Sequence, residues 1–383
     1  MINFNEKIVF KKFLSDNTYF FLLCAISLSI IVWIIQAVNF LDFISEDGHS
    51  FDIYFYFTAL NFPKIFKNIL PFIFFISLFY TISKYEDKNE LKIFWINGVN
   101  KIKFSNVLIK YTFLFFIFQI FLSSLLSPVL QDKARSFLKT SNMDFFPSLM
   151  QEKKFIDTVD KLTIFIQNKN SSEEFENIFL KDDLSNNKSQ IIYAKKGFLK
   201  DVNGVRKLIL FDGKFLNTDE KKTTVFNFSQ TEFDLTNYVT KSITHPKVQE
   251  LTTFLLLRCN YSFYVEKKLT RFFKFRDANI LCNGNFVREI NQELFDRLIK
   301  PLYLFLIAVI ACFLLTRYKE THKYKLHKIY IFALGIVTII FSEMSVNYAG
   351  KNLNSTIVFY ILPLLLTIIA YLTLRSKLIY KKK

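Results

Sequence analysis

Hydrophobic residues in this chain are gathered into long runs that charged residues do not interrupt. Residues 19–41, 111–131 and 352–374 contain no Asp, Glu, Lys or Arg over 21 to 23 positions each. A helix of about 22 residues rises about 33 Å, which is enough to cross a hydrocarbon core of about 30 Å. Each run therefore predicts a membrane-spanning helix.

Three less uniform apolar segments complete the pattern. They lie within residues 53–83, 302–315 and 329–350, and the first contains two prolines and two lysines, which predict a kinked or interrupted helix. The chain is thus expected to be a helical membrane protein with six spans. The expected domains are residues 1–131 with spans one to three, 132–284 as an insert, and 285–383 with spans four to six and a basic tail.

The insert has the pattern of an all-β domain with helical ends. Short β-branched and aromatic runs recur about every 10 to 16 residues between polar clusters, which predicts an antiparallel sandwich or jelly roll. The flanks "PKVQELTTFLLLRC" and "NFVREINQELFDRLIKPLYLF" read as helical, and the second continues into span four. The expected strands are "KLTIFIQ", "FENIFLKDD", "SQIIYAKKG", "RKLILFDGKFL" and "TTVFNFSQTEF".

The basic residues of the short loops predict the orientation of the spans. Lysines precede span one, whereas the loop "DFISEDGHSFD" after it has four acids and no Lys or Arg. The loop after span two, the loop "TRYKETHKYKLHK" and the tail "RSKLIYKKK" are all lysine-rich. Basic loops are retained in the cytoplasm, so we expect both termini to be cytoplasmic and residues 132–284 to be periplasmic.

The net charge of +17 does not indicate a nucleic-acid partner. Lysine supplies 41 of the 50 basic residues, whereas arginine is the residue suited to bidentate recognition of phosphates and bases. Membrane topology already explains where these charges lie. We therefore expect no nucleic-acid binding.

Signatures of an enzyme or of a metal site are missing from the sequence. No G-x-x-x-x-G-K-[ST] phosphate loop, no H-E-x-x-H or paired Cys/His spacing and no G-x-S-x-G elbow is present. The chain is expected to bind no cofactor or metal and to hydrolyse no ATP by itself. Cys24 and Cys312 lie in apolar spans; Cys259 and Cys282 could pair if their region is extracytoplasmic, but free thiols are the preferred interpretation.

Charged and amide side chains inside apolar stretches are candidates for a substrate cavity. Lys64 and Lys67 would each cost about 2.5 to 3.5 kcal/mol at a bilayer centre. One interpretation is that they snorkel near a helix end; the other is that they form a basic rim for an anionic amphiphile. Gln36 and Asn39 on span one are expected to line the same space.

A short amphipathic helix is predicted between spans two and three, in residues 86–99. Leu91, Phe94, Trp95 and Gly98 fall at positions i, i+3, i+4 and i+7 of one helical face, with Glu90 projecting elsewhere, and Gly98 is a candidate C-cap. The helix either lies in the headgroup layer or docks its aromatic face into a groove of a cytosolic partner.

The run "ISKYEDKNELKIFWINGVNKIKF" resembles the "D-x-E-L…G-[IV]-S" segment of the lipopolysaccharide export permeases, the LptF/LptG (YjgP/YjgQ) family. Glu90, Leu91, Gly98 and Val99 stand at matching positions, and Asn100 replaces the usual serine. The proline-bearing second span, the strand pattern, "VQELTTFLL" and "ELFDRLIKPLYLF" are also similar. The sequence "SVNYAGKN" and a first span without a basic residue favour an F-like over a G-like subunit.

The resemblance implies a role in an export machine of the bacterial inner membrane. Such a permease pairs with a second six-span permease, and a cytosolic ATPase homodimer that binds ATP and Mg²⁺ drives the pair. The pair extracts lipopolysaccharide and passes it to a periplasmic bridge protein with a jelly-roll fold. The implied ATPase-coupling residues are Glu90, Leu91, Phe94, Trp95 and Gly98.

Two other classes of function remain open from the residues alone. A secondary transporter or channel for an anionic amphiphile would work without an ATPase. A membrane-anchored scaffold or sensor would use the insert to bind a ligand.

Overall fold

The fold is seen in a computed structural model, which describes part of the chain. The described residues are 4–41, 51–140, 152–159, 162–169, 174–185, 188–202, 205–219, 222–234, 247–264, 286–351 and 353–380. They form two compact units. The first comprises residues 1–34, 61–131 and 247–383, and the second comprises residues 35–60 and 132–246.

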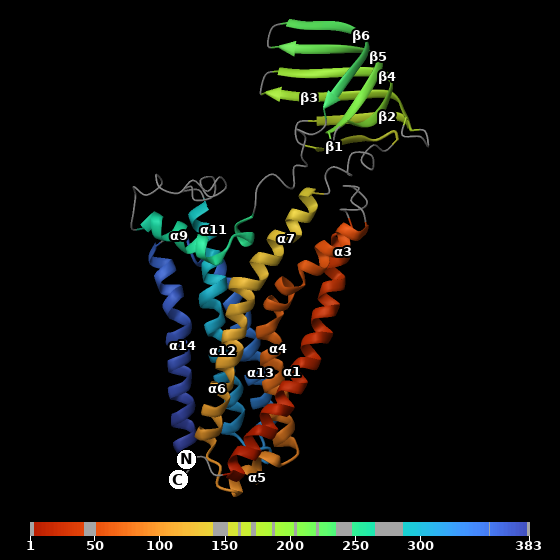
Figure 1. Cartoon of the computed structure of the whole chain (residues 1–383). Coiled ribbons are helices and arrows are strands. Elements are labelled where there is room, and N and C mark those ends of the chain that lie inside the picture. Colours follow the sequence, from red (N-terminus) through yellow and green to blue (C-terminus); the bar gives the residue numbers. More distant parts are fainter. Residues whose placement is uncertain are drawn as a thin grey trace. The chain divides into compact units, whose positions relative to one another are not determined.

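Helices make up the first unit and run side by side (Figure 1). Within the described residues, six helical segments are long and apolar enough to cross a membrane, which confirms the six predicted spans. These segments are Ile8–Asn39, Phe51–Asp87, Lys101–Phe137, Val287–Thr316, Tyr324–Tyr348 and Ser355–Ile379.

Several spans are built from more than one helical piece. Span one is α1 (Phe4–Asn39), span five is α13 (Tyr324–Tyr348) and span six is α14 (Leu353–Tyr380). Span two consists of α3 (Phe51–Leu60) and α4 (Phe62–Asp87). Span three consists of α6 (Lys101–Phe121), η1 (Leu122–Leu126) and α7 (Ser127–Thr140). Span four consists of α11 (Val287–Leu294), η5 (Phe295–Ile299), η6 (Lys300–Leu302), α12 (Tyr303–Cys312) and η7 (Phe313–Thr316). Between them lie α5 (Glu90–Ile96), η2 (Val248–Glu250) and α9 (Thr253–Tyr264).

The predicted interruption of span two is confirmed. α3 ends at Leu60, and α4 begins with Pro63 in its first turn, where a missing backbone N–H leaves no hydrogen bond unmade. Pro71 instead lies inside α4 without ending it. The prolines therefore differ in effect because only one of them is at a helix start.

Span four forms the centre of the helical unit. Every residue of α12 except half-buried Phe305 is buried, and α12 packs against α4, α6, α13 and α14. Gly335 allows α13 to approach α4 closely, because a Cβ at this position would lie 1.9 Å from the ring of Phe75 on α4. Ile, Leu and Val side chains on the outer faces of α1 and α14 are exposed, as expected for helices that face lipid or a partner protein.

Spans three and four each contain a π-helical turn, and the two turns are in contact. Ser123 Oγ of η1 donates a hydrogen bond of 3.0 Å to the carbonyl oxygen of Arg297 in η5. A π-turn inserts one residue into the helical ladder and changes which side chains face a neighbour. The predicted helix before span four is confirmed, and this irregular segment is part of it.

The second unit contains a six-stranded antiparallel sheet in the order β1-β2-β3-β4-β5-β6. All five predicted strands are present as β2 to β6, and β1 is additional. The sheet confirms the all-β insert. Jelly roll describes it only loosely, because in the described residues each strand pairs with its neighbours in the chain. The strands are β1 (Phe155–Val159), β2 (Leu162–Lys169), β3 (Glu174–Ser185), β4 (Lys188–Val202), β5 (Val205–Asp219) and β6 (Lys222–Asp234).

One face of the sheet holds the core of this unit. Ile164, Leu180 and Ile192 occupy one cross-strand row and are almost completely buried. At one level of the sheet, however, β2 to β5 each have two consecutive residues that are not buried. Asn177 and Asp212 at this level have φ of 52° and 49°. The sheet therefore bends along a line that crosses the strands.

The cysteines correct one expectation from the sequence. Cys259 is disulfide-bonded, whereas a free thiol was the preferred interpretation. Cys24 and Cys312 are free, as expected for residues inside spans. Cys282 lies outside the described residues.

Candidate functional site

The helix predicted after span two is present as α5. It begins after Asn89, whose φ of 60° is left-handed, and Gly98 with φ of 83° follows its end. Gly98 N donates to Trp95 O (3.1 Å) and Val99 N donates to Phe94 O (3.0 Å). These two bonds are those of a Schellman motif, which glycine favours because it has no Cβ to strain a positive φ.

The predicted aromatic face of α5 points into the chain's own helical core. Leu91 is 1% exposed and Phe94 is 9% exposed. The ring of Phe94 lies 5.9 Å from that of Tyr85 and 6.5 Å from that of Phe104, and half-buried Trp95 meets Phe104 edge-on at 5.6 Å. This face anchors α5 to the ends of α4 and α6.

Two isoleucines are the apolar side chains that α5 leaves open. Ile93 is 55% exposed and Ile96 is 79% exposed. Sequence periodicity had selected the other face, because it identifies an apolar stripe but not what the stripe packs against. Ile93 and Ile96 do not belong to the predicted apolar stripe, so the sequence pattern did not single them out.

Ion pairs connect the α5 region to the loop between spans four and five. Lys92 of α5 pairs with Glu320, and this hydrogen bond raises the pKa of Lys92 above its ordinary value. Lys328 Nζ lies 3.0 Å from Asp87 Oδ2, and Lys319 N donates to Glu86 Oε1 at 3.0 Å. Each contact is solvent-exposed and weak by itself.

Lys101 adds a more sheltered connection to the same loop. Its Nζ donates to the carbonyl oxygen of Leu315 at 2.7 Å. It also lies 3.9 Å from the ring centroid of Tyr318 and 5.4 Å from that of Trp95, which are cation–π distances. The α5 region is thus joined to both halves of the helical unit.

At the other end of the helical unit, four charged side chains form a chain of alternating sign. Lys67 Nζ lies 2.8 Å from Asp296 Oδ2, and Lys300 Nζ lies 2.8 Å from Asp296 Oδ1 and 2.8 Å from Glu343 Oε1. Both lysines are buried, and Glu343 is half exposed. The chain joins α4, the start of span four and α13, and its charges sum to zero.

Arg297, next to this chain, is completely buried and forms hydrogen bonds through all three of its guanidinium nitrogens. Its guanidinium donates to Glu293 Oε1 (2.8 Å), Leu251 O (2.8 Å), Thr253 Oγ1 (2.9 Å) and Gln249 O (3.0 Å). A planar fork of donors suits this arrangement, which lysine could not reproduce. Arg297 therefore fixes the segment from η2 to the start of α9 onto span four.

The four residues predicted to line a cavity lie in two different units of the chain. Lys64 Nζ donates to Gln249 Oε1 at 2.9 Å, and Lys67 is held in the ion chain. Gln36 and Asn39 lie at the end of α1 and belong to the other unit. The structure therefore gives each lysine a protein partner, and a cavity shared by all four residues stays a prediction.

Sequence reasoning missed Asp296 and Lys300 as members of the ion chain. They lie four residues apart in "FDRLIKP", a segment that the sequence pattern predicts to be helical. An acid and a base at this spacing directly before an apolar run could have marked them.

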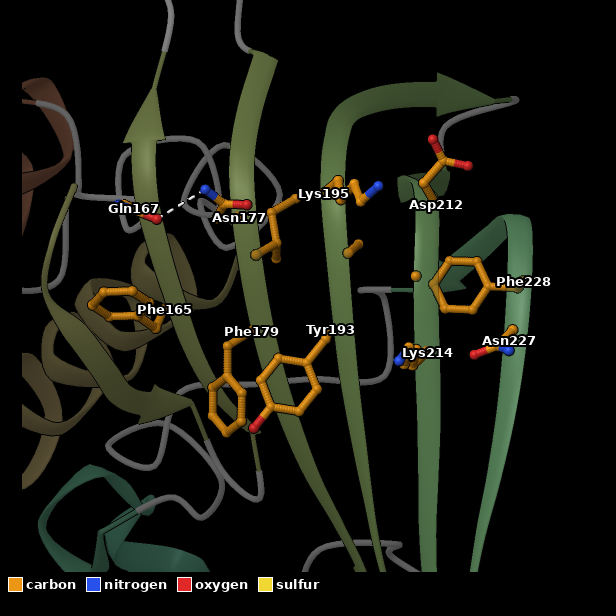
Figure 2. A pocket seen from close by; sticks show the side chains of 13 residues that line it. Phe165, Gln167, Asn177, Phe179, Tyr193, Lys195, Asp212, Lys214, Asn227 and Phe228 are labelled. Carbon is orange, nitrogen blue, oxygen red and sulfur yellow. Dashed lines mark hydrogen bonds between the residues drawn. The ribbon is translucent and has the colours of Figure 1, made fainter.

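The β unit carries a groove on the face opposite its core (Figure 2). One wall is the cross-strand row Phe165, Phe179, Tyr193, Lys214 and Asn227. The other wall consists of Gln167, Asn177, Lys195 and Asp212, which lie along the bend of the sheet.

The bend explains why this groove exists. Where the sheet folds toward its core, the outward rows on either side of the bend lean apart and leave a volume of about 630 Å³. Phe179 and Tyr193 lie 5.1 Å apart between ring centroids, and Gln167 Oε1 accepts a 2.8 Å hydrogen bond from Asn177 Nδ2 across the strands. The groove thus sets aromatic rings opposite amide, carboxylate and ammonium groups.

Comparison with known proteins agrees with these features. The model of the family "Lipopolysaccharide export system permease LptF/LptG" matches residues 12–377. The chain is also 23% identical over 371 residues to the uncharacterized protein RP871 of Rickettsia prowazekii (strain Madrid E), covering 96% of this chain and 99% of that protein. Six spans, a β-sheet insert and a family match over nearly the whole length show that this multi-pass membrane protein belongs to the LptF/LptG family of lipopolysaccharide export permeases.

Proposed function

We propose that this chain is one of two permease subunits of an ATP-driven exporter that takes lipopolysaccharide from the bacterial inner membrane to a periplasmic bridge protein. Family membership supports the transport of lipopolysaccharide. The sequence holds no phosphate-binding loop, so ATP and Mg²⁺ are assigned to a separate cytosolic ATPase. The "SVNYAGKN" segment favours the F-like subunit, with a G-like permease as its partner.

The geometry of α5 is the observation that best supports coupling to an ATPase. The Schellman motif caps the C-terminus of the helix, one face is packed into the membrane unit, and Ile93 and Ile96 remain exposed. A short helix that presents apolar side chains from a fixed base suits a groove on a partner protein. In this proposal Leu91, Phe94, Trp95 and Gly98 hold the helix in place, and the isoleucines make the contact.

The contacts of α5 provide a route for force into the spans. Movement of α5 would act on α4 and α6 through its buried face. It would act on span five through the contacts of Lys92 with Glu320 and of Asp87 with Lys328. Closure of the ATPase dimer would then change the packing of both halves of the permease together.

The groove of the β unit supports a role in passing on the substrate. Lipopolysaccharide presents sugar rings with apolar faces, many hydroxyl groups and anionic substituents. Aromatic rings such as Phe179 and Tyr193 can stack on sugar faces, amides can bond hydroxyls, and Lys195 and Lys214 can pair with anionic groups. The groove therefore suits the polar part of this amphiphile.

Co-purification from the native membrane tests the proposal. The wild-type chain should bring an ATPase and a second six-span permease with it. Ile96→Asp should release the ATPase because it places a charge in an apolar contact, while the second permease stays bound. Ile8→Asp is the control, since Ile8 is also exposed (55%, against 79% for Ile96) but lies on α1. Transport of lipid by the purified chain without any ATPase would overturn the proposal in favour of a stand-alone transporter.

A further inference from the structure

A second cavity lies at the end of the helical unit that also carries α5. It is bounded by η7, the first turns of α13 and the last turns of α14, and its volume is about 870 Å³. Four of its lining residues are basic: Arg317, Lys323, His327 and Lys377. Nothing in the proposed export mechanism uses this cavity.

The cations of this cavity differ from the other cations at the same end. Lys92 and Lys328 are each paired with a carboxylate. In the described part of the chain, by contrast, no carboxylate lies within ion-pair distance of Arg317, Lys323 or Lys377. Three uncompensated positive charges around one concavity repel one another, so an anion bound there would be stabilised.

The remaining walls of the cavity are apolar and reach the outer surface of the helices. Leu326 is 68% exposed and Tyr330 is 63% exposed on α13, and Leu334 follows on the same helix. Lys377 Nζ lies 5.6 Å from the ring centroid of Phe313, which holds its charge over the apolar floor. The cavity is therefore basic toward the helix ends and apolar along the spans.

His327 is fixed in this wall by hydrogen bonds. Its Nε2 lies 3.1 Å from the carbonyl oxygen of Phe313 and 3.3 Å from Thr316 Oγ1. These contacts connect the start of α13 to the end of span four. His327 is thus held in position in the cavity wall by contacts within the chain.

We propose that this cavity binds the headgroup of an anionic phospholipid, with the acyl chains lying along Leu326, Tyr330 and Leu334. A phosphodiester supplies the negative charge that the cations lack, and its lipid tails match the apolar strip beside them. Basic pockets between spans are suited to such headgroups. Assignment of the lipid to the inner leaflet rests on the orientation in the proposed function; the binding chemistry does not.

Two double variants test the site, and each of them removes two positive charges from the chain. Arg317→Gln with Lys377→Gln removes two cations of the cavity. Lys325→Gln with Arg375→Gln removes one lysine and one arginine from the same region that are exposed and do not line it. The measured quantity is the binding of phosphatidylglycerol and of phosphatidylcholine to the purified full chains. It is measured by co-sedimentation of labelled lipid with chains reconstituted in nanodiscs, and by native mass spectrometry.

The expected result is a preference of the wild type and the control for phosphatidylglycerol. The cavity variant should lose about thirtyfold in affinity for it, about fivefold for each cation removed. Exchange of the two cations, Arg317→Lys with Lys377→Arg, should keep binding and shows that the fold tolerates change here.

Three results would overturn the proposal. Equal losses in the cavity variant and the control would mean diffuse attraction to a charged surface. If inorganic phosphate bound to the cavity as well as phosphatidylglycerol does, the site would be one for a soluble anion. If the wild type bound both lipids equally, there would be no anion site. None of these results depends on an ATPase, so they are separate from failure of the export function.

Discussion

The ammonium group of Lys67 lies 2.8 Å from Asp296 Oδ2, which joins α4 to the first turns of span four. The same carboxylate meets Lys300 at 2.8 Å through its other oxygen. One acid therefore lies between two buried bases, and Glu343 supplies the second negative charge. This explains how an apolar chain tolerates lysines in its spans, and it makes Asp296 the residue on which the local charge balance depends.

Asp296→Asn should destabilise the helical unit strongly. Removal of one partner of a buried ion pair leaves an uncompensated charge and costs about 3 to 5 kcal/mol. The measurement is thermal unfolding of the purified chain in detergent. Glu343→Gln is the matched control, because Glu343 is half exposed and its loss should cost much less. Equal effects of the two changes would contradict a central role for Asp296.

Arg297→Lys should loosen the segment from η2 to α9 although it keeps the positive charge. Lysine cannot reproduce the donors that reach Gln249, Leu251 and Thr253 together. Hydrogen exchange of this segment is expected to speed up, while exchange in α12 stays slow. Unchanged exchange at η2 would show that other contacts hold the segment.

Gly98→Ala should weaken α5 by about 1 kcal/mol, since alanine is strained at a φ of 83°. A Cβ at this position would meet no neighbouring atom, so the effect comes from the backbone and not from a clash. Stimulation of ATP hydrolysis in the reconstituted complex should fall. Gly98→Asn should retain more activity because asparagine tolerates this conformation; an equal loss in both variants would argue against a role of the Schellman motif.

A photo-crosslinking residue in place of Tyr193 should capture lipopolysaccharide during transport. Tyr193 lies in the aromatic wall of the groove in the β unit. Phe226 provides the control, because it is similarly exposed on β6 but does not line the groove. Crosslinks should require ATP. Equal capture at both positions would indicate that the substrate does not use the groove.

Lys92→Glu should reduce coupling without lowering stability, since the Lys92 side chain is 49% exposed and surface ion pairs contribute little. Transport per ATP hydrolysed is the quantity to measure. The double change Lys92→Glu with Glu320→Lys restores an ion pair of opposite sense and should recover transport. If the single change has no effect, the loop after span four does not carry force from α5.

The candidate sites could be predicted from the sequence only in part. The position of α5 and the glycine that ends it followed from the period of Leu91 and Phe94 and from Gly98. Its start did not, since the helix was predicted over residues 86–99 and α5 begins at Glu90, after α4 ends at Asp87. Its exposed face did not, because a stripe of apolar residues is the same in sequence whether it packs inward or meets a partner. The groove on the β unit could not be predicted from the sequence either, because it forms only where neighbouring strands bend at the same level of the sheet.

The sequence by itself determined the six spans, the strands β2 to β6 of the insert and the distribution of basic loops. These are local properties: the thickness of the bilayer fixes the length of an apolar run, and the period of a strand fixes its alternation. Only the tertiary structure decided that Lys67 meets a carboxylate 229 positions away and that Cys259 forms a disulfide. The rotation of each helix about its axis sets such contacts, and that rotation results from packing against all of its neighbours at once.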